Sequence, residues 1–271
     1  MRQCVSGRCV RAPVEEGTAC MRSSNKDDEL PGTCEAGVCE LVSPDYSTGI
    51  GQLLETVIWA RLYHLGSTGV IHCRRYAMLP DTYRPCTVIA RTIIIDGAVQ
   101  SVGEGFEEGV SGPWQPCQPG ACVAGHGGSH GGEGGAVTGG ACHTPYDSVS
   151  VPWLPGAAGV SCSGTEGAAG GGGVRLLATG SLVVNGSIDV SGGDGAYGGA
   201  GGSIVLRGGG GVHGTGLLRA NGGAGTVAGG GGGRISIHGE SSLTPEQIVL
   251  DGGDGPDPGQ PGVVYPPSES K

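Results

Sequence analysis

Short apolar segments alternate with glycine runs along the second half of the chain, and they recur at a fixed interval. The segment IDVSGGDG, which begins at Ile188, resembles LRANGGAG from Leu218 and IVLDGGDG from Ile248. Between these copies lies a second unit, in which GGSIVLRG from Gly201 resembles GGRISIHG from Gly232, at nearly the same interval. A period of about 30 residues predicts stacked structural units that bury their apolar faces against one another.

An earlier copy of the repeat is visible in the first half of the chain. The segment IDGAVQSVG from Ile95 matches VNGSIDVSG from Val184, an interval close to three periods. Residues 87–95 are rich in β-branched side chains, which predicts one strand or a pair of strands. The apolar positions of residues 50–66 fit either a helix or a strand, and the β-rich sequence after them favours a strand. We therefore expect the repeat architecture to start within residues 43–103.

These patterns predict an all-β fold: a glycine-rich, β-helix-like solenoid with a small disulfide-rich module before it. Residues 174–255 carry the repeats, and residues 104–173 form an insertion rich in glycine, proline and cysteine. The Gly-Gly-Asp-Gly turns are expected to use positive φ at the corners. The runs Gly170–Gly173 and Gly229–Gly233 can pack backbone against backbone. The prolines of residues 256–271 predict an extended tail or linker.

Composition indicates that covalent links help to hold this fold. The chain has 60 glycines and only 4% aromatic residues, so a thick globular core is not expected. Its 11 cysteines are typical of an oxidising, extracellular environment. Their recurrent C-x4-C spacing differs from the C-x2-C of zinc sites and favours disulfides. Cys73 and Cys86 are expected to pair with each other. The expected disulfide residues are Cys4, Cys9, Cys20, Cys34, Cys39, Cys73, Cys86, Cys117, Cys122, Cys142 and Cys162.

Residues 1–42 predict a small cysteine-rich module, in which CVSGRC from Cys4 recurs as CEAGVC from Cys34. The module has few apolar residues besides its cysteines, so disulfides must supply its stability. Its units resemble the EGF-like and disintegrin-like disulfide modules of secreted proteins. Because the number of cysteines is odd, we expect one partner to lie upstream of Met1, in a longer secreted protein of which this chain is a fragment.

Charge and hydropathy exclude two classes of partner. The net charge is −10, and the few basic residues are scattered, which argues against nucleic-acid binding. No apolar run approaches the length that spans a membrane, so we expect no membrane span in this segment.

The segments VNGSIDVSGGDG, GGAGGSIVL, LRANGGAG and GGGGGRISI, taken together, resemble glycine-rich β-helical segments of very large secreted or cell-surface proteins. The resemblance covers roughly residues 85–255. It implies an extracellular structural or adhesive role, and it implies no catalytic residues.

Two groups of side chains could in principle hold a metal. His126, His130 and Glu133 combine two imidazoles with a carboxylate, but the glycines between them rule out a helix that would align them. The simpler interpretation is that they decorate a glycine-rich loop. Calcium could be held at the repeated turns, where the simpler interpretation is that each aspartate caps its own turn. The turn aspartates are Asp189, Asp194, Asp251 and Asp254.

Two further sites follow from the sequence. Asn185 begins the N-x-S sequon of a possible glycosylation site, and the alternative is an asparagine with positive φ in a turn. Glu104, Glu107 and Glu108 surround Phe106 and could suggest glycoside hydrolysis, although no aromatic sugar platform is near them in the sequence.

The sequence therefore predicts a non-enzymatic extracellular protein fragment without a required cofactor. We expect it to act by assembly into a surface coat, fibre or flagellar-hair-like filament, or by adhesion. Its partners would be copies of itself, other matrix or surface proteins, or glycans. The alternative is a β-helix that binds or cleaves carbohydrate.

Overall fold

The computed structural model describes several strands within residues 3–54 by their backbone, and most of the chain from residue 57 onward. Side chains are described for residues 58, 60–73, 83, 85–107, 125–136, 144–161 and 167–266. In this part of the chain the structure consists of strands, extended backbone and turns, with one short 3-10 helix, η2 (Pro245–Gln247). None of its helical segments has the length and apolar character to cross a membrane.

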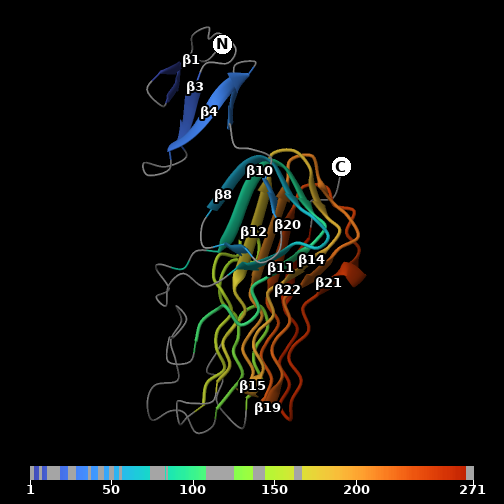
Figure 1. The fold of residues 1–271 in the computed structure, drawn as a ribbon. Helices are drawn as coiled ribbons and strands as arrows, with labels where there is room; N and C mark the ends of the chain where they lie inside the picture. The colour runs from blue at the N-terminus through green and yellow to red at the C-terminus, as the bar shows by residue number, and fades with distance from the viewer. Residues whose placement is uncertain are drawn as a thin grey trace.

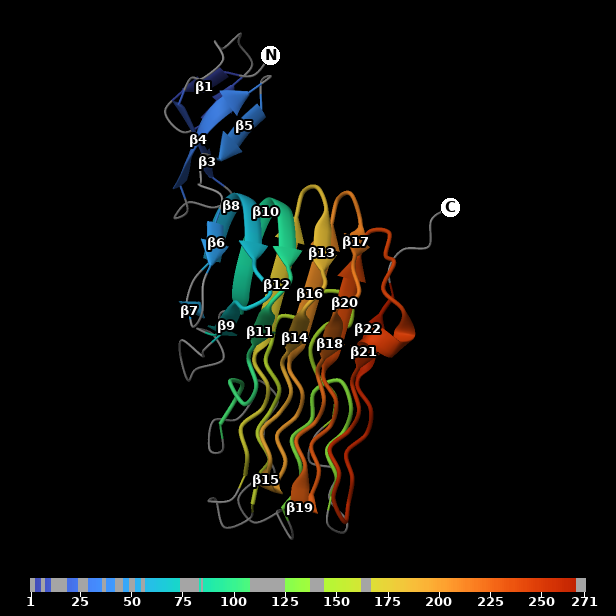
Figure 2. The same cartoon turned by 45° about the vertical axis from the view of Figure 1, so that its right-hand side comes forward.

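The chain winds into a parallel β-solenoid, as predicted, in which two sheets share one core (Figures 1 and 2). The first sheet contains, in spatial order, β17 (Val212–His213), β13 (Leu182–Val184), β10 (Cys86–Ile95), β12 (Gly173–Ala178), β16 (Ser203–Gly208), β20 (Arg234–His238) and β22 (Val263–Tyr265), and β8 (Val57–Leu65) and β6 (Tyr46–Thr48) extend it from β10. The second sheet contains β21 (Ile248–Val249), β18 (Leu217–Arg219), β14 (Ser187–Asp189), β11 (Ala98–Gln100), β9 (Val70–Cys73) and β7 (Gln52–Leu54).

Smaller antiparallel sheets precede the solenoid, and a short parallel pair lies far from its two main sheets. Near the N-terminus, β1 (Gln3–Val5) pairs with β2 (Arg8–Val10), while β4 (Glu29–Glu35) lies between β3 (Ala19–Ser23) and β5 (Val38–Leu41). The parallel pair consists of β15 (Gly195–Tyr197) and β19 (Gly225–Ala228).

The register of the sheets follows the sequence repeat. Ile188 of β14 pairs with Leu218 of β18, which pairs with Ile248 of β21, so one period of the sequence is one full turn of the chain. Val99 of β11 pairs with Ile188, and Ile95 pairs with Val184, as the earlier copy of the repeat predicted. The prediction that the solenoid begins before the glycine-rich half is confirmed, because β8 and β10 are paired in parallel.

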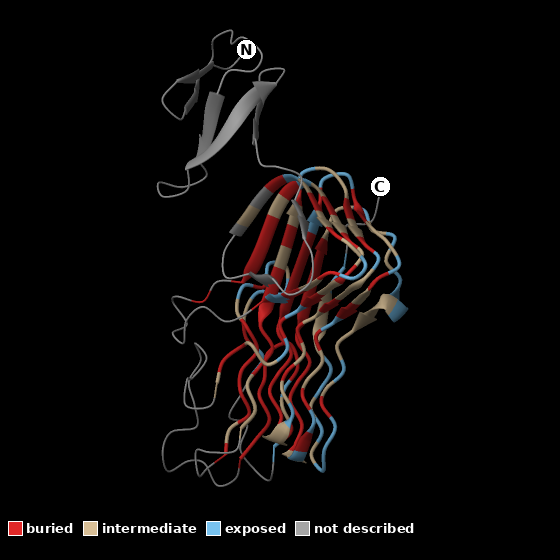
Figure 3. Cartoon of the chain, in the orientation of Figure 1, coloured by how far each residue is buried: buried red, intermediate tan, exposed pale blue. Residues whose placement is uncertain are grey.

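The core is a narrow stack of aliphatic side chains between the two sheets. Figure 3 colours the buried residues of both sheets red. The second sheet contributes one or two buried residues per turn, and the first sheet contributes several. Equivalent residues of successive turns lie on top of one another, because a parallel in-register stack repeats each side chain in the next layer. The fully buried members include Leu65, Ile71, Ile93, Ile95, Leu176, Leu182, Ile188, Ile204, Leu206, Leu218 and Ile235.

Residues 57–65 are the long strand β8, so the helix alternative for residues 50–66 is wrong for this stretch. Residues 52–54 form strand β7 in the second sheet. At the end of β8 the core-facing residues alternate with more exposed ones: Tyr63 and Leu65 are buried, whereas His64 between them is half-buried. Strand β10, which is rich in β-branched residues, pairs with β8 in parallel, and this pairing favours a strand over a helix for residues 57–65.

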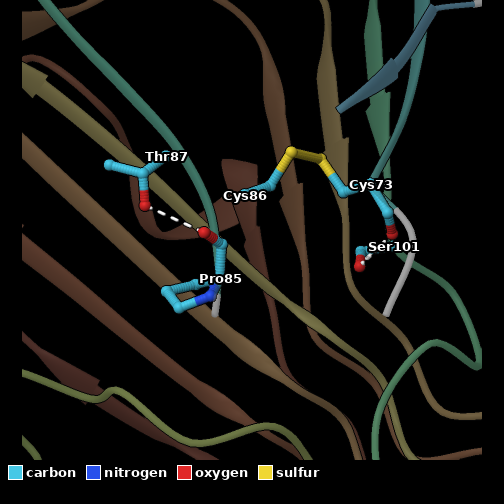
Figure 4. Close-up of a disulfide and its surroundings, with 5 residues drawn as sticks. All are labelled: Cys73, Pro85, Cys86, Thr87 and Ser101. Atoms are coloured by element: carbon cyan, nitrogen blue, oxygen red, sulfur yellow. Dashed lines mark hydrogen bonds between the residues drawn. A yellow bond between two sulfur atoms is a disulfide. The ribbon is translucent and has the colours of Figure 1, made fainter. Parts of the chain in front are cut away.

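Cys73 and Cys86 form a disulfide, as predicted (Figure 4). The bond joins the end of β9 to the start of β10, and both cysteines are buried. Next to it, the Ser101 hydroxyl donates to the Cys73 carbonyl at 2.8 Å. The Thr87 hydroxyl donates to the Pro85 carbonyl at 2.9 Å. The side chains of the other nine cysteines lie outside the described residues, so their predicted bridges stay predictions.

The prediction of a tail after residue 255 is wrong for residues 256–266. Strand β22 pairs in parallel with β20, with Val264 opposite Ile235. Residues 257–262 continue the repeat that leads into β22, because Asp257 forms a bridge with Ala228. The last solenoid turn is therefore built from the proline-containing segment. Residues 267–271 lie outside the described residues.

The prediction of positive φ in the Gly-Gly-Asp-Gly turns is also wrong. Among the described residues, the glycines with positive φ are Gly103, Gly211, Gly214 and Gly239, and none of them belongs to these turns. The turn glycines recur in each repeat for a different physical reason, which is the close approach of neighbouring backbones described below.

Candidate functional site

Beyond the two sheets, each turn of the chain continues into a bundle of extended glycine-rich segments (lower half of Figures 1 and 2). Most of the bundle lies outside the named strands, although its segments run side by side over their whole length. We call it the glycine bundle and define it as residues 125–136, 154–161, 167–173, 189–203, 219–233 and 249–262.

The hydrogen bonds of residues 198–202 reveal the geometry of the bundle. Consecutive N–H groups donate to three different neighbouring segments, and the direction repeats after three residues. Three residues per turn without internal hydrogen bonds is the geometry of a polyproline II helix, which glycine can also adopt. The acceptor carbonyls, in chain order, belong to Ala228, Gly193, Ala157, Gly231 and Val190, at distances of 2.8–3.0 Å.

The next repeat has the same pattern. The N–H groups of residues 229–233 again donate in three directions with a three-residue period. The acceptors, in chain order, belong to Asp257, Gly223, Gly128, Gln260 and Ala220, at 2.7–2.9 Å. Each segment in the middle of the bundle is therefore bonded to neighbours on several sides, whereas a strand in a sheet is bonded on two sides only.

Glycine is required at many positions of the bundle because the backbones there approach too closely for a side chain. A Cβ atom added at Gly230 would lie 2.0 Å from the carbonyl oxygen of Gly199. One added at Gly223 would lie 1.9 Å from the oxygen of Gly193. The prediction that glycine runs such as Gly229–Gly233 pack backbone against backbone is confirmed.

The segment predicted as an insertion forms a third layer on the scaffold: residues 125–136 and 154–161 lie in the bundle, and residues 144–153 lie against the first sheet. Gly128 donates to the Gly198 carbonyl and accepts from the Gly231 N–H. Ala157 accepts from the Ala200 N–H at 2.9 Å. Residues 125–136 and 154–161 are thus integral to the scaffold and do not form a separate excursion from it.

A buried polar cluster joins this third layer to the first sheet. It consists of His130, Tyr146, Asp147 and Arg234. The Arg234 side chain, on β20, donates to the carbonyls of Tyr146 at 2.8 Å and His130 at 3.3 Å. The His130 Nδ1 donates to the Gly201 carbonyl at 2.8 Å, and its ring contacts that of Tyr146 with centroids 4.9 Å apart. The His130 Nε2 lies 3.8 Å from the Asp147 carboxylate, too far for a hydrogen bond.

Asp147 organises the backbone around the cluster. It has φ of 70°, and it is the one non-glycine residue with positive φ among those described. Its carboxylate accepts from the N–H groups of Ser148, Trp153 and Leu154, each at 2.7 Å. Burial alone would raise the pKa of Asp147, but His130 and these N–H groups stabilise the charged form more, so the pKa is lowered. The carboxylate thus fixes a closed loop of residues 147–154.

Residues 148–154, which we call the strap, cross the outer face of the first sheet. The Ser203 hydroxyl of β16 donates to the Leu154 carbonyl, and the Ser236 hydroxyl of β20 donates to the Ser150 carbonyl. The strap exposes apolar side chains at alternate positions. These are Val149, Val151 and Trp153. The Arg175 guanidinium carbon lies 4.4 Å from the centre of the Trp153 ring, an arrangement suited to a cation–π interaction.

The structure separates the candidate metal ligands of this region. His126 and His130 are buried, so the interpretation that they decorate a loop is wrong. His126 donates through Nδ1 to the Gly127 carbonyl at 2.9 Å, whereas His130 belongs to the polar cluster. Glu133 is exposed and accepts from Gln260 at 3.3 Å. No group of three or more His, Cys, Asp or Glu side chains in the described ranges is arranged to hold a metal ion.

We expect the buried His126 to make the stability of the fold pH-dependent. Burial lowers the pKa of His126 below 6.5, although the hydrogen bond to Gly127 opposes this. Because the unfolded state then binds the proton more readily, stability should fall as the pH drops from about 6.5 towards the lower pKa of the folded state. Chemical denaturation at several pH values should show this slope, and His126→Asn should flatten it. Equal slopes in both proteins would contradict the assignment.

The turn aspartates act mainly as hydrogen-bond acceptors. The Asp189 carboxylate accepts from the Ser191 N–H at 3.0 Å and from its hydroxyl at 2.6 Å, which is the predicted capping of its own turn. Asp194 instead accepts from the Ala224 N–H at 2.7 Å and so links one repeat to the next. Through their backbone carbonyls, Asp251 and Asp254 accept from the preceding repeat.

The glycosylation candidate Asn185 is exposed, but its side chain is engaged. Its Nδ2 donates to the Asp96 carboxylate at 2.8 Å, and Asp96 also accepts from His64 Nε2 at 2.8 Å. The three side chains come from successive turns of the solenoid and are linked by these hydrogen bonds. The hydrogen bonds from Asn185 and His64 stabilise the carboxylate and lower the pKa of Asp96. The alternative of positive φ at Asn185 is wrong.

The acidic group near Phe106 is described in part. Glu104 and Glu107 are both half-buried, whereas Phe106 is buried and packs with Tyr146 and Ala157. Glu108 lies outside the described residues. Phe106 thus belongs to the packing of the third layer, a contact that sequence spacing could not reveal.

No protein-family model matches this chain, and searches of the curated proteins and of the solved structures also found no match. The structure shows a β-solenoid fold, and the resemblance to glycine-rich secreted proteins stays a prediction from the sequence.

Proposed function

We propose that this chain is a structural segment of an extracellular protein, which supplies a rigid scaffold to a surface coat, fibre or filament, or to an adhesive layer. The observation that carries the proposal is the glycine bundle, where consecutive N–H groups donate to several neighbouring segments. Such a network fixes the backbone along its whole length. Rigidity of this kind suits a spacer or a wall component better than a binding cleft that must adapt to a ligand.

The polar side chains support a role without catalysis. The imidazole, guanidinium and hydroxyl groups of His130, Arg234 and Ser236 hold backbone carbonyls, and the Asp147 carboxylate holds backbone N–H groups. Residues of these types act in catalysis in many enzymes, but in this structure their hydrogen bonds join separate segments of the scaffold. The buried disulfide Cys73–Cys86 is consistent with an oxidising environment outside the cell.

The second candidate function is carbohydrate binding, and the strap is the observation that favours it. Trp153 is 38% exposed beside Val151, and Tyr265 on β22 is 38% exposed. Exposed aromatic rings on a rigid sheet can stack on sugars. A Trp153→Ala variant that loses binding to a polysaccharide retained by the wild type would establish this function in preference to the first.

Negative-stain electron microscopy of the purified disulfide-bonded protein, combined with assays on polysaccharides, tests the structural proposal. We expect ordered assemblies, or attachment to a matrix surface, together with no turnover of any polysaccharide. Isolated particles that cleave a polysaccharide at a measurable rate would contradict the proposal. The Trp153→Ala variant serves as a control, because assembly through the scaffold should survive it.

A further inference from the structure

The hydrogen bonds of the glycine bundle have a direction. The N–H groups of Gly198 and Gly201 point towards the next repeat and donate to Ala228 and Gly231. In that repeat, the N–H groups of Gly229 and Gly232 do the same and donate to Asp257 and Gln260. Each repeat thus forms one layer along the axis of the solenoid, and its N–H groups donate to the layer formed by the repeat that follows it in the sequence. A bundle that simply stopped would expose unpaired donors at its last layer, which is a template for another chain.

The register identifies which residues of the last layer occupy these donor positions. Arg234 pairs with Val263, and Ala228 forms a bridge with Asp257, so the offset between these two layers is constant. The same offset carries Gly229 and Gly232 to positions 258 and 261. Both positions are proline, and both prolines are exposed.

The other positions of this layer keep the pattern of the repeat. Gly259 donates to Gly253, and Gln260 donates to the Glu133 carbonyl. Gly262 donates to Leu250 at 2.7 Å. Prolines thus replace glycine only where the N–H would point outward, and residues that donate inward retain their N–H groups.

A proline at these positions acts in two ways. It removes the donor, because its nitrogen carries no hydrogen. In addition, a ring carbon of proline takes the place of that hydrogen. A carbonyl oxygen of an added chain would have to come within about 2.9 Å of the nitrogen, as the Asp257 oxygen does at the Gly229 nitrogen, and there it would collide with the ring carbon. The last repeat has a second outward-facing segment, residues 249–255. Its N–H groups at Leu250, Gly252 and Gly255 are equivalent to donors of the preceding repeat, and none of them is replaced by proline. A neighbour held away by the proline rings cannot reach these donors at bonding distance.

We propose that Pro258 and Pro261 close the C-terminal edge of the glycine bundle, so that a second copy of this chain cannot add to it. Proline at an edge is a known means of preventing strands from pairing between molecules. The closed edge stops the bundle from growing on this side and leaves its other surfaces for contacts. This inference does not depend on the proposed function, because it concerns an edge that stays closed whether or not the protein assembles elsewhere.

The first test opens the edge with the double variant P258G/P261G. We expect it to self-associate at protein concentrations at least about tenfold lower than the wild type in sedimentation velocity, since two outward donors become free. The matched control is P145G/P256G, which also replaces two exposed prolines but restores no donor at positions 258 and 261. The control should sediment like the wild type. A folded P258G/P261G variant that also sediments like the wild type would overturn the proposal.

The second test places the prolines inside the bundle and so does not depend on intermolecular contact. Residues 234–262 are duplicated in tandem, so that the first Pro258 and Pro261 face an added layer. We expect proteolysis to remove the added layer, and we expect glycine at both positions of the first copy to protect it at least about tenfold longer. Equal protease resistance of the proline and glycine tandems, whether both are stable or both are cleaved, would overturn the proposal.

Discussion

Gly223→Ala should destabilise the protein severely, whereas Gly193→Ala should be nearly neutral. The two glycines occupy equivalent positions of successive repeats. A Cβ atom at Gly223 would lie 1.9 Å from the Gly193 oxygen and 2.5 Å from its carbonyl carbon, and both atoms belong to a backbone held on several sides. We expect a loss of about 3 kcal/mol, since the layers must separate to admit the methyl group.

At Gly193 the nearest atom to an added Cβ is the Ala169 oxygen at 3.2 Å, so the neighbour needs to move by only a small amount. Alanine there also reduces the freedom of the unfolded chain, so the net change should stay within about 1 kcal/mol. Thermal and chemical denaturation of the two variants, each with intact disulfides, measure the difference. Similar stability of the two alanine variants would show that the layers are not packed this closely.

Arg234→Met is the substitution outside the glycines for which we expect the largest loss. The Arg234 side chain is buried and donates to the carbonyls of Tyr146 and His130, which belong to different segments of the third layer. Methionine fills a similar volume but leaves these carbonyls without the guanidinium and removes a positive charge near Asp147. The expected loss is about 3 kcal/mol, typical of breaking a buried charged network.

The matched control is Arg207→Met, which makes the same chemical change on the adjacent strand β16. Arg207 is exposed, so its replacement should change the free energy of unfolding by no more than about 0.5 kcal/mol. Limited proteolysis adds a second measurement, because the Arg234 variant should be cut first within residues 144–155. Equal losses at the two arginines would contradict the role assigned to the polar cluster.

The repeat in the sequence was sufficient to predict the solenoid and its register. The partners Ile188, Leu218 and Ile248 could be aligned because they are apolar residues beside a recognisable turn, and the structure pairs them in that order. The strand β8 was harder to predict, since its apolar positions fit two periodicities. What decided its structure was the neighbouring strand β10, a tertiary effect that no local pattern contains.

The geometry of the glycine segments was not predictable from turn preferences. A glycine is equally suited to positive φ and to close backbone contact, and the sequence alone does not distinguish these uses. Proline is frequent in linkers, so the prolines at 258 and 261 favour a tail when only the sequence is considered. Their spacing of three residues was the available signal, since it matches the period at which Gly229 and Gly232 donate.

The polar cluster escaped prediction for a different reason. His130 and Arg234 are 104 residues apart, and the contact between them exists only because the third layer folds back onto β20. The sequence singled out His130 together with its near neighbours His126 and Glu133, but the structure gives these three residues different surroundings. Spacing along the chain is informative within one element, and here the residues that meet come from separate layers.

Hydrogen–deuterium exchange of residues 198–202 and 229–233 tests the account most directly, because its central claim is that these glycine runs form a rigid, fully bonded bundle. If each N–H group is bonded to a neighbouring segment, these amides should exchange as slowly as those of the core strands β16 and β20. Complete exchange within seconds, as in an exposed glycine-rich loop, would contradict the bundle and the scaffold function that rests on it.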